Sequence, residues 1–289
     1  MAADDMVLVT GASGRTGQRV IAALTDRKNK VRAFVRRESS GNDLVRAGAA
    51  QFVCGDLESS DDIVRAVHGC GKIIHICPPM HHAEDRIAKA MIACAANSGV
   101  NHFILYSVLH PVINVPHHRR KLAAEEALIE SGLQYTILQP GRYMQHLNGI
   151  WNEVRHKGLH AMPFSISTCF SLTDLDDLAQ AAALIATQDH HFGATYQLAG
   201  PQALSQQDCA RILSDLLGTA VRAQRRDPQL ALEAATKAGW PDSRIENMRI
   251  MNAHYDACGL EGNSNVLRWL LGREPTDFAA FVRRELLAR

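Results

Sequence analysis

Three glycines near the N-terminus are spaced as in a phosphate-binding loop. Gly11, Gly14 and Gly17 follow an apolar run at 6–10 and precede a helical stretch. The first glycine would allow a tight turn, the second a close backbone approach to a pyrophosphate, and the third close packing of helix on strand. The first helical amides would donate to the phosphate oxygens. The sequence therefore predicts a dinucleotide site, with a glycine-rich turn that binds nothing as the alternative. The expected contacts come from Gly11, Ser13, Gly14, Arg15, Thr16 and Gly17.

Two arginines stand where the type of dinucleotide would be selected. An NAD site usually has an acidic residue at the end of the second strand, which accepts a hydrogen bond from the ribose 2′-hydroxyl. This chain has Arg36 and Arg37 there, followed by Glu38 as a counter-signal. A guanidinium binds phosphate through two hydrogen bonds, so Arg36 or Arg37 together with Arg15 would suit a 2′-phosphate. The pattern favours NADP(H), unless these arginines are merely solvated.

Residues after the third and fourth strands are further candidates for the cofactor site. Asp56 could accept a hydrogen bond from the adenine amino group while Leu57 packs on the ring, although an aspartate here could equally cap a turn. Cys77 ends the fourth strand. We expect it to be a small residue beside the cofactor, and a redox nucleophile is the less favoured interpretation.

The helix expected at about 117–131 carries two residues that could act on a substrate. His117, Lys121, Ala124 and Leu128 share one helical face. Since Ala124 and Leu128 should pack on the sheet, His117 and Lys121 should continue that inner face. A lysine rarely points inward without a partner, and a ribose hydroxyl would be one; otherwise it reaches solvent. With an ordinary pKa near ~6.5, His117 could donate a proton, or it could be a polar loop residue.

Apolar and aromatic residues after the sixth strand suggest a pocket for a planar substrate. Tyr143 should lie on the nicotinamide side of that pocket, and packing within the core is the alternative for every member. The candidates are Pro140, Tyr143, Met144, His146, Trp151, Trp240, Met248, Met251 and Tyr255.

The order of elements that must position these residues is typical of an α/β fold. Short β-branched runs alternate with Ala-rich helical stretches, which indicates a parallel sheet covered on both faces. With right-handed crossovers this is a doubly wound Rossmann sheet. We expect a cofactor domain at 1–150, a returning segment at about 170–200, and a smaller, mostly helical substrate lobe at 201–289. Strands are expected at 6–10, 31–36, 51–54, 72–77, 102–107, 135–139, 195–199 and 221–225, with helices at 143–156 and 175–186 among others.

Composition excludes several classes of protein. The 289 residues are 46% apolar and carry a net charge of +1, so we do not expect nucleic-acid binding driven by excess positive charge. No apolar run reaches the length of about 18 residues that spans a membrane. Seven cysteines without CxxC spacing, and an N-terminus unlike a signal peptide, predict reduced thiols in the cytoplasm. The histidine pairs lack metal-site spacing, so no metal is expected.

The ordered motifs together resemble one family. TGASGRTG at 10–17, VRAFVRR at 31–37, GDL at 55–57, FILYS at 103–107, HHRRK at 117–121 and YTILQPGRYM at 135–144 are similar to the NmrA-like group of atypical short-chain dehydrogenases/reductases. That group includes NADP(H)-dependent reductases of quinones, triphenylmethane dyes and phenylpropanoids, and also non-catalytic NADP-sensing regulators. Ordinary members of the wider family use Tyr-x-x-x-Lys, whereas this chain has His117 four residues before Lys121.

The resemblance implies an NADP(H)-dependent oxidoreductase in which Lys121 holds the nicotinamide ribose and His117 is the candidate proton donor. Loss of the tyrosine favours acceptors that need little proton assistance. We therefore expect a small aromatic, quinonoid or conjugated-carbonyl substrate, and a monomer or homodimer. The alternative is a regulator that senses NADP(H) through a protein partner and performs no chemistry.

Overall fold

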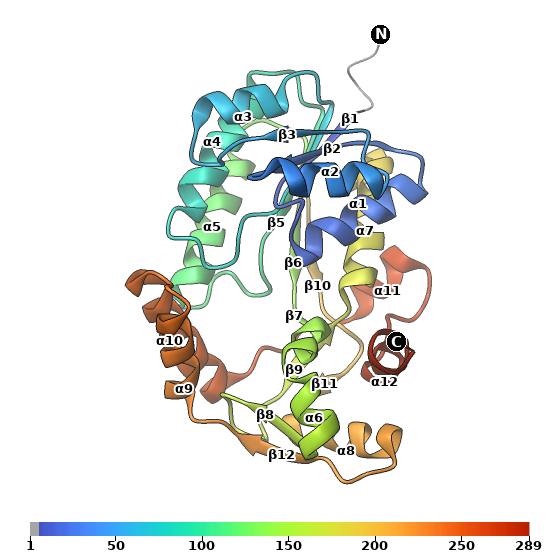
Figure 1. The fold of residues 1–289 in the computed structure, drawn as a ribbon. Helices are drawn as coiled ribbons and strands as arrows, with labels where there is room; N and C mark the ends of the chain where they lie inside the picture. Colours follow the sequence, from blue (N-terminus) through green and yellow to red (C-terminus); the bar gives the residue numbers. More distant parts are fainter. Residues whose placement is uncertain (1–5, 289) are drawn as a thin grey trace. The chain divides into compact units, whose positions relative to one another are not determined.

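The computed structural model describes residues 6–288, which form two compact units (Figure 1). The first unit contains the chain up to Ile113, His118–Gln139 and Leu178–Tyr196. The second contains Asn114–His117, Pro140–Asp177 and the chain from Gln197 onward. Residues 178–196 thus return to the first unit, and apart from Asn114–His117 the second unit begins at Pro140. That the second unit binds substrate stays a prediction.

A seven-stranded sheet forms the centre of the first unit, as the alternating pattern predicts. Its order is β10-β6-β5-β4-β1-β2-β3, and the pairs from β6 through to β3 are parallel. The order reverses between β1 and β4, which is the switch point where open α/β sheets bind ligands. The strands are β1 (Met6–Val9), β2 (Lys30–Val35), β3 (Gln51–Cys54), β4 (Lys72–His75), β5 (His102–Tyr106), β6 (Tyr135–Pro140) and β10 (Ala194–Leu198).

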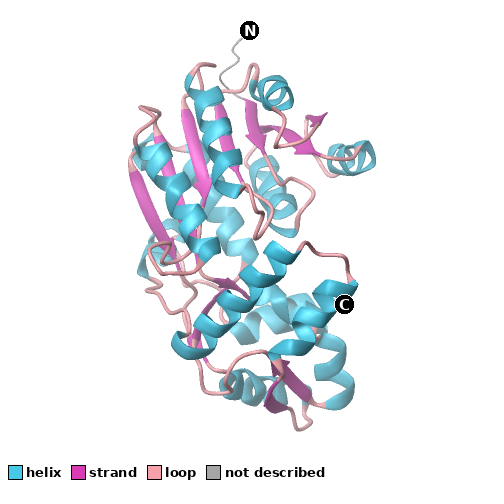
Figure 2. Ribbon diagram, turned by 90° about the vertical axis from the view of Figure 1, so that its left-hand side faces the viewer, coloured by secondary structure: helices cyan, strands magenta, loops and turns pink. Residues whose placement is uncertain are grey.

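Helices cover both faces of this sheet, which confirms the doubly wound α/β fold. One face packs on α3 (Ser60–Val67), α4 (Glu84–Ala96) and α5 (Pro116–Ile129) around a common apolar core. Figure 2, seen from the side of α4 and α5, shows these helices in front of the strands. On the opposite side lie α1 (Arg15–Asp26) and α7 (Leu175–Thr187) (Figure 1). Successive side chains of β5 point to opposite faces of the sheet. Leu105 packs in the apolar core beneath α3, α4 and α5, whereas the Tyr106 hydroxyl donates to the Leu178 carbonyl of α7 at 3.2 Å. The first unit also contains α2 (Glu38–Arg46), which contacts β2 and β3, and the 3₁₀ helix η3 (Asp189–His191).

The second unit combines two small sheets with helices around a separate apolar core. Its sheets have the orders β11-β9-β7 and β12-β8. The strand expected at 221–225 is β12, and the tail is mostly helical as predicted. Its elements are β7 (Arg142–Tyr143), η2 (Met144–Gly149), α6 (Trp151–Lys157), β8 (Leu159–Met162), β9 (Phe170–Thr173), β11 (Ala203–Leu204), α8 (Gln206–Leu217), β12 (Arg222–Arg225), α9 (Pro228–Lys237), α10 (Asp242–Cys258), α11 (Asn265–Leu271), α12 (Phe278–Val282) and η4 (Arg283–Leu287).

The single helix expected at 143–156 is wrong. A strand and a 3₁₀ helix occupy its first half, and α6 begins only after Ile150, whose backbone leaves the helical region (φ −119°, ψ 6°). The buried Gln145 accounts for the tight first half, because its amide donates to Asp174 at 2.6 Å and accepts from the Leu175 amide. These tertiary bonds hold 144–149 in a geometry that local helix propensity does not favour.

No helix in residues 6–288 has both the length and the apolar character needed to cross a bilayer.

Several histidines are buried in the neutral form, and His102 of β5 shows why. Thr136 uses its one hydroxyl proton to donate to the His191 carbonyl at 2.8 Å, so His102 must donate from Nε2 to the Thr136 hydroxyl, also at 2.8 Å. Burial of the ring, with Lys72 nearby, lowers the pKa of His102 to about 4. The fold therefore favours the uncharged ring.

This burial predicts acid-sensitive stability. Between pH 6.5 and 4 the unfolded chain binds a proton at His102 that the folded chain does not, so stability is lost as pH falls through this window. We expect His102 to contribute a loss of about 2 kcal/mol between pH 7 and pH 5. His102→Gln keeps a donor for Thr136 but does not titrate. Urea unfolding across this range should show a shallower pH dependence in the variant; equal slopes would contradict the assignment.

Candidate functional site

The glycine loop between β1 and α1 follows a path that side chains would block. Gly11 has a φ of +59°, and a Cβ there would lie 2.6 Å from the Ile76 carbonyl oxygen. A Cβ on Gly17 would lie 2.4 Å from the Gly11 carbonyl oxygen. Both distances are shorter than any carbon–oxygen contact that packing allows. The loop therefore packs directly against neighbouring backbone, as the spacing of the glycines predicts.

The N-terminus of α1 is open at this loop. Gly14 is the N-cap residue in an extended conformation, and no side chain caps the helix. The loop is braced by the Gly14 amide, which donates to the Gly11 carbonyl at 3.0 Å, and by Gln18, which donates to the Ser13 carbonyl at 3.0 Å. Ser13 is exposed, as are Gly14 and Arg15. A braced, uncapped helix N-terminus is a suitable place for a phosphate.

The two arginines after β2 lie on the surface. Arg36 and Arg37 are exposed, and Arg37 is the N-cap residue of α2, which Glu38 opens. Neither arginine side chain makes an ion pair or hydrogen bond with another residue of 6–288. Their guanidinium groups thus carry positive charge that no nearby carboxylate neutralises, which suits a phosphate ligand.

Asp56 and Leu57 are placed by the turn after β3. The Asp56 carboxylate accepts from the Glu58 amide at 2.9 Å, and the Asp56 amide donates to Asp62 at 2.7 Å. Leu57 is buried in the apolar core with Ile63. The turn-capping alternative thus accounts for the contacts of Asp56, and contact of either residue with adenine stays a prediction.

Lys121 is held by a buried carboxylate. Its Nζ lies 2.7 Å from Oε1 of Glu84 and donates to the Tyr106 carbonyl oxygen at 2.9 Å. Glu84 is 2% exposed in the first turn of α4, where the helix dipole favours a negative charge. Ala124 and Leu128 pack in the core on the sheet, as the shared helical face predicts. Sequence reasoning missed Glu84, because no local pattern links α4 to α5.

Lys121 lines a small, mostly buried cavity of the first unit. Burial and the nearby Lys121 lower the pKa of His75 to about 4, so this ring is neutral. Burial and the nearby Glu84 raise the pKa of Cys77, so its thiol stays protonated. A protonated thiol is a poor nucleophile, which favours the packing interpretation of Cys77. The lining residues are His75, Cys77, Glu84, Ala88, Leu105, Tyr106, Ser107, Lys121 and Ala124.

His117 is buried in the first turn of α5, one helical turn before Lys121. Ser107, at the end of β5, donates its hydroxyl proton to Glu125, and Gln139 donates to the same carboxylate at 2.9 Å. Ser107 is therefore committed to a buried carboxylate network. The role of His117 as a proton donor stays a prediction.

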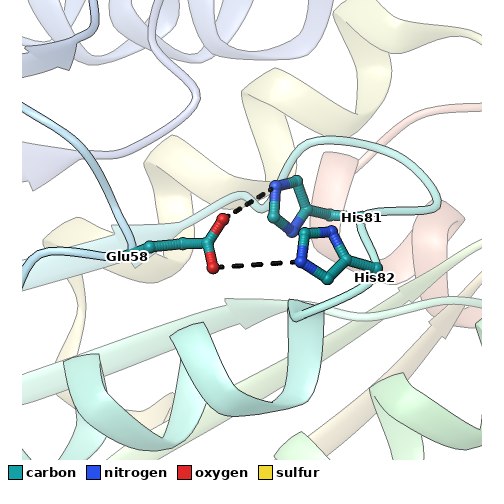
Figure 3. Close-up of side chains that lie close together, drawn as sticks. All are labelled: Glu58, His81 and His82. Carbon is teal, nitrogen blue, oxygen red and sulfur yellow. Dashed lines mark ion pairs between the residues drawn. The ribbon is translucent and has the colours of Figure 1, made fainter. Parts of the chain in front are cut away.

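One cluster of metal-binding side-chain types does form in the first unit, although the sequence predicts no metal. The Nε2 atoms of His81 and His82 lie 3.7 and 4.0 Å from the two carboxylate oxygens of Glu58 (Figure 3). However, Nδ1 of His81 accepts from the Ala83 amide at 3.2 Å, so the ring proton of neutral His81 is on Nε2. A donor thus faces the carboxylate, and Arg86 lies 3.1 Å from the same group. This arrangement favours an electrostatic cluster over a metal centre.

The second unit contains an apolar pocket of about 450 Å³, part of which is open to solvent. Tyr143, Met144 and His146 line it as expected, and the Tyr143 and His146 rings stack with centroids 6.0 Å apart. Trp151, Trp240, Met248 and Met251 do not line it, and Tyr255 lies behind two of its phenyl rings. The lining residues are Arg142, Tyr143, Met144, His146, Leu147, Ile150, His160, Met162, Phe164, Phe170, Leu172, Leu204, Ser205, Gln206, Cys209 and Phe278.

Sequence reasoning missed the phenylalanines and the one permanently charged residue of this pocket. Phe164 comes from the irregular segment between β8 and β9, and Phe278 from the distant tail. Arg142 did carry a signal, because a charged residue follows the buried strand β6 by only two positions.

Comparison with known proteins gives matches that cover almost the whole chain. The model of the NmrA-like family matches residues 3–281. NAD(P)H azoreductase of Xenophilus azovorans is 29% identical over 285 residues, covering 98% of this chain and 99% of the relative. Quinone oxidoreductase 2 of Escherichia coli (strain K12) is 26% identical, covering 96% and 97%. Triphenylmethane reductase of Citrobacter sp., solved with NADP(H), has a TM-score of 0.84 at 23% identity, covering 97% and 100%, which shows the shared fold.

The Glu84–Lys121 pair predicts a strong, coupled effect on stability. Glu84→Gln leaves the Lys121 ammonium in a largely dry site without its carboxylate, and we expect a loss of about 3–5 kcal/mol in urea unfolding at pH 7. Glu84→Gln combined with Lys121→Met removes both charges and should cost far less than the two single changes together. Glu126→Gln, on the exposed side of α5, serves as the control. Strictly additive losses would show that the two charges do not interact.

Proposed function

Since the chain belongs to the NmrA-like family, we propose that it is an NADPH-dependent reductase of small aromatic, azo, quinonoid or conjugated-carbonyl acceptors. The observation that carries this proposal is the loop of Gly11 and Gly17, packed so closely that no side chain fits, at the uncapped N-terminus of α1. Relatives that match almost the full chain are reductases of the azo and quinone type by name, which supports the same chemistry here.

The preference for NADPH over NADH rests on the charge at the end of β2. NAD sites place a carboxylate at this position, which would repel a 2′-phosphate. Here Arg36 and Arg37 are exposed and carry no counterion within the described chain. With Arg15 at the start of α1, they provide the guanidinium groups that bind phosphate through paired hydrogen bonds.

Bound NADPH supplies the hydride, and the chain orients the reactants. Lys121, fixed by Glu84 and the Tyr106 carbonyl, is the candidate to hydrogen-bond the nicotinamide ribose. The neutral His75 and the protonated Cys77 add no net charge to this cavity. A neutral acceptor that gains a hydride must also gain a proton, and His117 is the candidate donor. Acceptors that delocalise the incoming charge depend least on that proton, which suits a site with histidine where ordinary enzymes have tyrosine.

The direct test is oxidation of NADPH by the purified protein, followed by absorbance, with azo dyes, quinones, triphenylmethane dyes and aryl enones as acceptors. Turnover with any class supports the reductase. Tight NADPH binding without turnover on the whole panel would favour the alternative of a sensor that acts through a protein partner. Failure to bind either NADPH or NADH would refute both functions.

The arginines predict a selective change in cofactor affinity. Arg36→Ala and Arg37→Ala should each weaken NADPH binding, and the arginine that contacts the 2′-phosphate should do so by about 10-fold or more, because a charge-assisted hydrogen bond is lost. NADH binding should stay within twofold of its original value. Titration by fluorescence or calorimetry measures both constants. Arg46→Ala, an exposed arginine of α2 that pairs with Asp43, is the matched control. Equal weakening of both cofactors would contradict the assigned role.

A further inference from the structure

We infer that the pocket of the second unit binds aromatic acceptors that carry a carboxylate or similar oxyanion, with Arg142 as the residue that anchors the acid group. The inference rests on the proposed function, because it takes the bound molecule to be the acceptor of the reductase reaction. It then defines the class of acceptor more narrowly. An apolar planar molecule would satisfy most of the lining, but it would leave the guanidinium without a partner.

The position of Arg142 is set by the backbone of β7. Arg142 pairs in register with Leu172 of the parallel strand β9. A Cβ on the preceding Gly141 would lie 2.8 Å from the Ser171 carbonyl oxygen, so the two segments approach closely at this point. The guanidinium carbon lies 4.7 Å from the ring centroid of Phe164 and 4.9 Å from that of Phe170. The cation thus lies against both rings, whose centroids are 5.1 Å apart, at the pocket wall.

No anion of the described chain compensates this charge. Arg142 makes no side-chain hydrogen bond or ion pair with another residue of 6–288. Burial lowers its pKa to about 10, so the group remains charged at pH 7. Its titratable neighbours are neutral: burial and Arg142 lower the pKa of His160 to about 4, and burial raises the pKa of Cys209 and of Tyr255 to about 12.

A second group in the same pocket also lacks a partner. Nδ1 of His160 is buried and makes no hydrogen bond. By contrast, Gln206 donates to the Phe164 carbonyl at 2.6 Å and accepts from the Met162 amide at 3.0 Å, and Ser205 donates to Asp208. The polar groups left for a ligand are therefore a guanidinium and an imidazole nitrogen. A carboxylate can accept from the guanidinium, and from Nδ1 of His160 in the tautomer that carries the ring proton there.

The energetics favour a role in binding over a role in folding. A buried cation without a counterion destabilises a fold, and its replacement by an apolar side chain of similar volume is often neutral or stabilising. A ligand oxyanion would supply the missing counterion at the moment of binding. The phenyl and aliphatic lining would then bury the rest of a planar molecule.

The test compares ligands that differ only in charge. We expect biphenyl-4-carboxylate to bind the protein alone at least 10-fold more tightly than biphenyl-4-carboxamide in calorimetry. Arg142→Met should weaken carboxylate binding by about 10- to 100-fold and leave the carboxamide unchanged. Arg155→Met, which removes an exposed charge of α6 in the same unit, should change neither. If wild type does not prefer the carboxylate, or if Arg142→Met binds both ligands as wild type does, the inference is wrong.

Two further measurements separate the possible failures. Arg142→Met should melt at the same temperature as wild type or higher, and a strong loss of stability would assign Arg142 to folding instead. Should that variant not fold, Arg142→Lys decides the question, because it keeps the charge but loses the paired geometry and should bind the carboxylate more weakly than wild type.

With NADPH present, 4-(phenylazo)benzoate should have a lower KM than its methyl ester, and this difference should disappear in Arg142→Met. The biphenyl ligands require neither NADPH nor turnover, so they test the anchor even if the reductase proposal fails.

Discussion

The first unit depends on the absence of side chains at the loop between β1 and α1. At Gly11 and Gly17 any Cβ would collide with a backbone oxygen, so these positions set how closely the first helix packs against the first strand. That close packing leaves the N-terminus of α1 uncapped and braced at the switch point of the sheet. Packing and the proposed phosphate binding thus have the same cause here, because the contact that excludes side chains also brings backbone amides to the place where an anion would lie.

The two units surround a partly buried cation in different ways. Lys121 in the first unit has Glu84 at 2.7 Å and a carbonyl oxygen at 2.9 Å, so its charge is compensated within the protein. Arg142 in the second unit has only the faces of two phenyl rings. Since desolvation of a charge is costly in both places, the first arrangement stabilises a fixed position for the ammonium group, whereas the second leaves free energy to be recovered when an anion binds. The presence or absence of a counterion therefore distinguishes the two roles: Lys121 is fixed in position, whereas Arg142 is left to bind an anion.

Neutral buried groups complete this electrostatic pattern. Burial penalises charged forms, so His75, His102 and His160 stay unprotonated, whereas Cys77 and Cys209 stay protonated. Around Lys121 and Arg142 the protein therefore adds few further charges. A low charge density suits acceptors that are apolar and planar. Burial of the neutral histidines also means that acid destabilises the fold, because the unfolded chain binds protons that the buried rings do not bind.

The sequence by itself determined the sheet, the glycine loop, the arginines after β2 and the inner face of α5, since each depends on spacing within a few residues and on short-range backbone geometry. Tertiary structure alone decided the rest. Glu84 meets Lys121 only because α4 and α5 pack side by side. Phe164, Phe170 and Phe278 line one pocket with Arg142 only after distant segments fold together. The helix expected at 143–156 was broken by bonds from Gln145 to Asp174, which local propensity does not contain. Contacts between segments far apart in the chain arise from the packing of whole helices and strands. The periodicity within a single segment does not determine which distant segment packs against it.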